Sequence, residues 1–96
     1  MTSIKFGLAE GTVVHKSAGM VRVAATFNST TGLRSASISG GYSGGASNFN
    51  PPVKESVLTI DWHVAYFPTG KYKFTAEATD VAAAPTQASI TLILEA

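Results

Sequence analysis

The sequence predicts an all-β protein, folded as an antiparallel β-sandwich of about seven strands. Apolar and polar residues alternate with a period of two in several separate runs, and turns that contain glycine or proline divide these runs. No window of useful length carries apolar residues at helical spacing. Since 96 residues suffice for one hydrophobic core, residues 1–96 are predicted to form a single domain.

The strongest alternation lies towards the C-terminus. Every second residue from Tyr72 to Ala78 is apolar, and the residues between them are Lys, Thr and Glu, which is typical of a strand with one solvated face. A further strand follows over Ala88–Leu94, after a break at Asp80–Pro85. The same pattern predicts strands near residues 4–8, 13–14, 21–27, 35–38 and 58–64.

Residues that favour turns separate these strands. Asn28–Gly32 and Phe67–Gly70 are predicted to be tight connections, and Gly40–Asn50 a long polar loop closed by two prolines. Helical structure is expected to be absent or limited to one turn around Phe49–Lys54. Short strands at this spacing indicate a sandwich of the immunoglobulin type.

The segment Trp62–Asp80 resembles the repeated pattern of bacterial and phage immunoglobulin-like (Ig-like) domains. It holds a Trp, the run Pro-Thr-Gly-Lys-Tyr at 68–72, an Ala-rich alternating strand and a closing Asp. Residues 88–94 and 35–41 are similar to other strands of that family. The resemblance implies an Ig-like fold and says almost nothing about function. The chain departs from the family pattern after Asp80, where the apolar turn Val81–Pro85 replaces a Gly-Asn turn and forms a candidate contact surface.

Three residues of this segment have predicted structural roles. Tyr72 is placed to form a tyrosine corner, with its ring inside and its hydroxyl bonded to the backbone just upstream. Trp62 is in phase with Leu58 and Ile60, which predicts a core position; the alternative is an aromatic platform for a glycan. Asp80 is predicted to accept backbone N–H bonds in the turn that follows it, and calcium binding is the alternative.

No catalytic or metal site is predicted. The two histidines, His15 and His63, are far apart in the sequence, and there is no cysteine. Ser43 lies in a run that approaches a nucleophile elbow but lacks the following helix. Asp61 and His63 have the residue types of a Ser-His-Asp triad. However, the sequence indicates no pocket and no helix N-terminus that would form an oxyanion hole. We therefore expect neither enzymatic activity nor a cofactor.

The charge balance argues against several classes of partner. Seven Lys and Arg against six Asp and Glu give a net charge of +1, which does not fit a nucleic-acid binder or a polybasic membrane anchor. No apolar run approaches the ~20 residues of a membrane span. Charged residues make up only 14% of the chain, and Ala24, Val57 and Ile93 are expected to point outward. Two interpretations of these features stay open: an ordinary β-rich surface, and a surface partly covered by a protein partner or by copies of the chain itself.

Two functions are compatible with the sequence. In the first, the chain is a complete virion structural protein, made without a signal peptide, that decorates a phage capsid or tail at the virion surface. In the second, it is an Ig-like repeat of a bacterial adhesin or a glycan-binding accessory module of a secreted enzyme, located at the cell surface or secreted. We expect the first. The candidate binding residues are Tyr42, Phe49, Tyr66, Ala83 and Pro85.

Overall fold

The structure is a computed structural model that describes residues 2–40 and 43–96, apart from the side chain of Ser43. Six β-strands and two short 3-10 helices form within these residues. In chain order they are β1 (Thr2–Phe6), β2 (Val13–His15), η1 (Lys16–Ala18), β3 (Val21–Gly40), β4 (Ser43–Trp62), η2 (Val64–Tyr66), β5 (Gly70–Asp80) and β6 (Pro85–Glu95).

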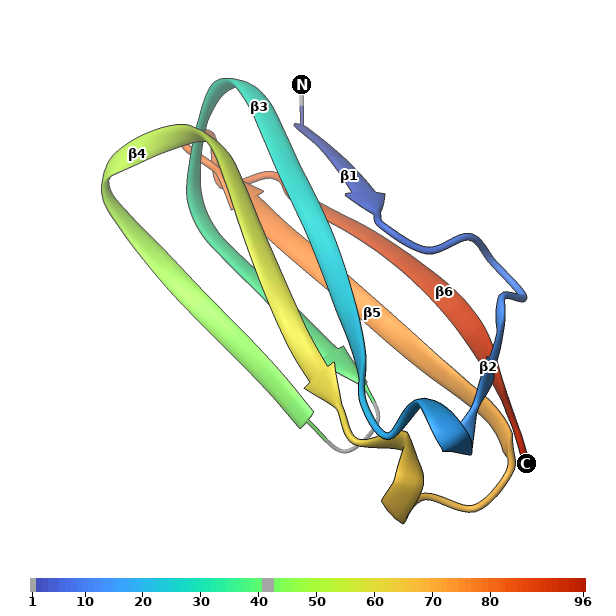
Figure 1. Ribbon diagram of the computed structural model, residues 1–96. Helices are drawn as coiled ribbons and strands as arrows, with labels where there is room; N and C mark the ends of the chain where they lie inside the picture. Colours follow the sequence, from blue (N-terminus) through green and yellow to red (C-terminus); the bar gives the residue numbers. More distant parts are fainter. Residues whose placement is uncertain (1, 41–42) are drawn as a thin grey trace.

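The strands form two layers because β3 and β4 each fold over and contribute to both (Figure 1). In the first layer, residues 21–29 of β3 pair with β1 on one side and with residues 55–62 of β4 on the other. In the second layer, residues 35–40 of β3 lie between residues 43–48 of β4 and β5, and β6 and β2 follow. This confirms the predicted all-β Ig-like sandwich.

Two details differ from the prediction. The pair formed by β2 and β6 is parallel, so the sheet is mixed rather than purely antiparallel. The described residues form six strands rather than about seven, since the expected breaks near Asn28–Gly32 and Asn50–Pro52 are bends inside β3 and β4. At these bends the backbone changes layer, and in β3 the bend includes Gly32 at a positive φ of 118°.

The predicted loop at Gly40–Asn50 is wrong, as is the helical turn around Phe49–Lys54. Residues 43–48 pair in register with Ser35–Gly40, and β4 continues through both proline positions. Alternation failed to reveal this strand because its residues are small or polar on both faces, as expected of an edge strand that covers little of the core. The helical turns lie instead at η1 and η2.

The core lies between the layers and is built from the predicted inward positions. Val23, Ala25 and Phe27 of β3 face Phe74 and Ala76 of β5, and all five are fully buried. Each large apolar side chain removed from water contributes about 1.5–3 kcal/mol. The other buried apolar residues are Leu33, Ala36, Ile38, Ile60, Trp62, Val64, Ala78, Ile90, Leu92 and Leu94.

Trp62 is a core residue, as its phase along the strand predicts. Its side chain is 1% exposed, and its ring packs against Tyr72 and Phe74 with centroid separations of 5.0 and 5.1 Å. A ring enclosed in this way presents no face to a sugar. Any aromatic platform for a glycan must therefore come from another residue.

Candidate functional site

Three turns meet at one end of the sandwich, the upper end in Figure 1, and we call residues 28–32, 50–54 and 80–85 the loop end. The backbone N–H of Val81 donates to the carbonyl of Gly32 at 3.1 Å, which ties the β5–β6 turn to the bend of β3. Gly32 has a φ of 118°, and a Cβ there would lie 3.2 Å from Pro52 Cβ and 3.4 Å from Val81 Cγ1. Glycine is needed at this position for backbone conformation and for close packing.

The side chain of Ser29 fixes the bend in β3. Its Oγ accepts the backbone N–H groups of Thr31 and Gly32 at 3.3 and 3.1 Å. Ser29 is 5% exposed and lies where β3 passes from the first layer to the second. Its hydroxyl therefore satisfies donors that the bend removes from the strand ladder.

Asp80 organises the turn at the other side of the loop end. Its Oδ1 accepts the backbone N–H groups of Ala82 and Ala84 at 2.9 and 3.1 Å, as expected from the sequence. Two backbone bonds between Asp80 and residues 83 and 84 close the same turn. Ala83 adopts a φ of 62°, which a non-glycine residue rarely does. The Asp80 carboxylate is therefore used to hold the loop rather than directed towards a cation.

The surface of this turn is apolar and exposed. Val81 is 37% exposed, and the alanines and Pro85 that follow it are exposed as well. Among the described residues, Ser29 and Asp80 are the buried polar side chains, and both hold turns of the loop end. The structure thus presents an exposed apolar turn whose backbone is hydrogen-bonded to Asp80.

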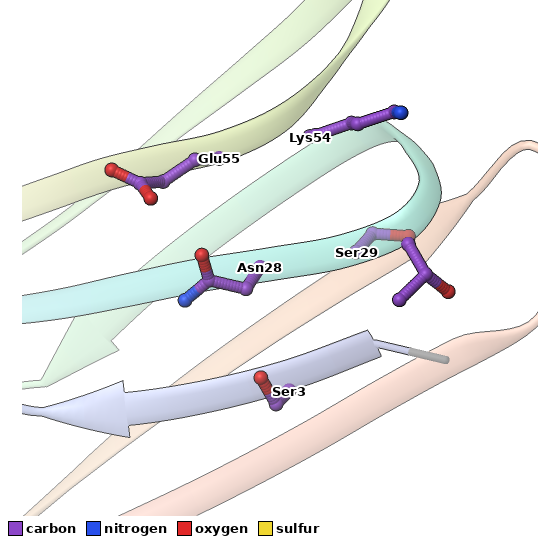
Figure 2. A pocket seen from close by; sticks show the side chains of 6 residues that line it. Ser3, Asn28, Ser29, Lys54 and Glu55 are labelled. Carbon is purple, nitrogen blue, oxygen red and sulfur yellow. The ribbon is translucent and has the colours of Figure 1, made fainter.

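Two shallow hollows flank the loop end. The first has a volume of about 430 Å³, and Figure 2 shows the side chains of Ser3, Asn28 and Glu55 extending from three neighbouring strands across it. Ser29, Thr30 and Lys54 complete its lining. Every residue that lines it has a polar or charged side chain, unlike the apolar turn at residues 81–85.

The second hollow, of about 380 Å³, contains the predicted binding residue Phe49 together with Arg34, Asn48, Asn50 and Pro52. Phe49 does not lie in an exposed loop as expected. It belongs to β4, is half-buried, and packs against the core. Only part of its ring remains available at the hollow.

The remaining candidate binding residues do not gather in one place. Ala83 and Pro85 lie on the loop end, whereas Tyr66 lies in η2 at the opposite end of the molecule. Tyr66 is 85% exposed, and its ring centroid is 6.3 Å from that of His63. Tyr42 lies outside the described residues. Of the two tyrosines proposed as an exposed aromatic platform, Tyr66 is the one that lies within the described residues.

The residues considered for catalysis have other contacts. Asp61 Oδ1 lies 3.1 Å from Arg22 Nε in an exposed ion pair across the β3–β4 ladder, and His63 packs against Tyr66. Across residues 2–40 and 43–96, no group of three or more His, Cys, Asp or Glu side chains is arranged to hold a metal ion. Within the same residues, no helix has the length and apolar character needed to span a membrane.

The outward apolar residues expected from the sequence are only partly exposed. Val57 is 53% exposed, whereas Ala24 and Ile93 are half-buried. Ile93 pairs with Val13 of β2, which is itself 44% exposed. These positions lie on both layers, whereas the exposed apolar residues 81–85 follow one another in a single turn of the loop end.

These features define the fold class: the chain is an all-β, Ig-like β-sandwich. Among solved structures it is similar to the fibronectin(III)-like modules of Clostridium thermocellum CbhA, with a TM-score of 0.63 and 16% sequence identity. The match covers 99% of this chain and 46% of that one, so the chain spans less than half the length of the matched chain. No protein-family model and no curated protein sequence matches the chain. At this level of identity the similarity establishes the fold alone.

Proposed function

We propose that the chain is a non-catalytic virion structural protein, which attaches to a phage capsid or tail assembly through protein–protein contacts. The observation that carries this proposal is the exposed apolar turn Val81–Pro85, whose backbone N–H groups donate to Asp80. An exposed apolar surface of this kind is a typical feature of a protein-binding site.

The hydrogen bonds that close the apolar turn support protein binding. Ordering a mobile loop lowers affinity, whereas a loop fixed before binding avoids this cost. The turn contains no charged residue between Val81 and Pro85, and the whole chain has a net charge of only +1. Binding therefore rests on apolar contact and backbone complementarity rather than on electrostatic attraction.

Co-sedimentation with phage particles assembled without this chain tests the proposal. We expect binding to reach a saturating ratio. Ala82→Lys and Ala84→Lys should each weaken it at least about tenfold by placing a charge in a desolvated contact. Gln87→Lys is the matched control, because it adds the same charge on the exposed face of β6. If the loop variants bind as well as this control, the loop end is not the contact.

A second function is supported by the similarity to fibronectin(III)-like modules, where this chain matches only part of a longer chain. In this alternative the chain is a repeat of a bacterial adhesin or a glycan-binding module of a secreted enzyme. Such a module would not sediment with particles, and a glycan-binding one would be retarded in gels that contain soluble polysaccharide. Tyr66→Ala should abolish that retardation, since Tyr66 is 85% exposed and available for stacking.

A further inference from the structure

The outer strand of the second layer has an open edge. Residues 43–48 of β4 pair with β3 on one side, and no described strand pairs with them on the other. Alternate residues of an edge strand direct their N–H and C=O groups outward, where they can pair with another strand. Gly44, Gly45, Ala46 and Asn48 are exposed, Ser47 is half-buried, and none is charged.

The other described edges carry features that block pairing. β2 at the far side of the same layer has only three residues and leads directly into η1. In the first layer, β1 carries Lys5, and residues 53–62 of β4 carry Lys54, Glu55 and Asp61. Short length and charged side chains are the usual protection of sheet edges. The segment Gly44–Asn48, which we call the open edge, has neither.

We propose that the open edge pairs with the open edge of a second copy of this chain, in an antiparallel arrangement with twofold symmetry. A twofold axis at Ala46 places Ala46 opposite Ala46, Gly44 opposite Asn48, and Gly45 opposite Ser47. Each pair joins residues of the same sheet face, as strand pairing requires. Each larger side chain then meets a glycine of the other copy, so the two backbones approach without a clash.

The charge of the chain favours this occupant. The open edge has no charged residue, and a net charge of +1 gives little repulsion between copies. A twofold interface brings the same segment of both copies together, so an uncharged strand with short side chains is suited to it. Stable protein interfaces bury about 1,200–2,000 Å² of surface, and pairing of two short strands buries less, so the dimer is weak. This pairing is independent of the proposed attachment to a particle.

Sedimentation of the purified protein tests the pairing without any other partner. The weight-average mass should rise from 9.9 kDa towards twice that value as the concentration approaches about 1 mM. Ala46→Lys and Ala46→Glu should each raise the dissociation constant at least about tenfold, because like charges then face each other. An equimolar mixture of the two variants should dimerise again. Gln87→Lys, three strands away on β6, should dimerise like the unmodified protein.

Amide resonances of the unmodified protein give a second measurement that needs no variant. Those of Gly44–Asn48 should move as the concentration rises, while those of β1 should not. A protein that stays monomeric at about 1 mM would overturn the proposal. So would charged Ala46 variants that dimerise like the unmodified protein, or a mixture of the two that stays monomeric.

Discussion

The hydroxyl of Tyr72 donates a 2.6 Å hydrogen bond to the backbone carbonyl of Pro68, four residues earlier in the chain. This bond fixes the connection between η2 and β5. The Tyr72 ring packs against Trp62 and Phe67, with centroid separations of 5.0 and 5.9 Å. The start of β5 is therefore held to the core by both halves of one side chain.

The first prediction concerns this residue. Tyr72→Phe should lower the free energy of unfolding by about 1 kcal/mol, because it removes one hydrogen bond and keeps the ring. Tyr72→Ala should lower it by about 3 kcal/mol through loss of the ring packing. Urea denaturation measures both changes. Equal stability of the two variants would show that the ring packing contributes nothing.

The second prediction concerns the carboxylate that holds the apolar turn. Asp80→Ala should lower the free energy of unfolding by about 2 kcal/mol, because the N–H groups of Ala82 and Ala84 lose their acceptor. Asp80→Asn should lower it by only about 1 kcal/mol, since an amide oxygen can accept the same bonds. Amide hydrogen exchange should increase at Ala82 and Ala84 in Asp80→Ala. Unchanged protection there would contradict the assigned role.

The third prediction uses the left-handed backbone of Ala83. Ala83→Gly should raise the free energy of unfolding by about 0.5–1 kcal/mol, because glycine adopts a φ of 62° without steric cost. The neighbouring Ala82→Gly should lower the free energy of unfolding. Ala82 has no positive φ to relieve, so the substitution only adds conformational freedom to the unfolded chain. Urea denaturation of the two variants should show changes in the free energy of unfolding that are opposite in sign. Two changes of the same sign would argue against this turn conformation.

The fourth prediction concerns the contact between turns at the loop end. Gly32→Ala should lower the free energy of unfolding by about 1–3 kcal/mol, because an added Cβ meets Pro52 and Val81 at a strained φ. Gly45→Ala is the control, since a Cβ there meets nothing within 4 Å. Thermal melting compares the two variants. If Gly32→Ala and Gly45→Ala have the same melting temperature, the three turns of the loop end do not pack as described.

The sequence predicts elements where one face is apolar and the other is polar. Tyr72–Ala78 and Ala88–Leu94 show this alternation and form most of β5 and β6. The open edge was not predicted as a strand because its short side chains show no alternation of apolar and polar residues. It is a strand because its backbone pairs with β3, not because its side chains are buried. For the same reason Phe49 was predicted to lie in a loop, although it belongs to β4.

The candidate site could be predicted only in part. Asp80 and the apolar turn are adjacent in the sequence, so local turn chemistry indicates both. The contact of Gly32 with Val81 joins residues 49 positions apart, and the sequence carries no local signal for it. The bend residues Ser29 and Gly32 lie in the predicted turn Asn28–Gly32, but their role in supporting another turn follows from the topology alone.

The salt dependence of particle binding measures whether the proposed contact at the loop end is apolar. Co-sedimentation isotherms at about 0.05 and about 0.5 M NaCl should give dissociation constants within about threefold of each other, because few charge pairs are present to be screened. A dissociation constant that rises more than about tenfold over this range would show that binding rests on charge rather than on apolar contact.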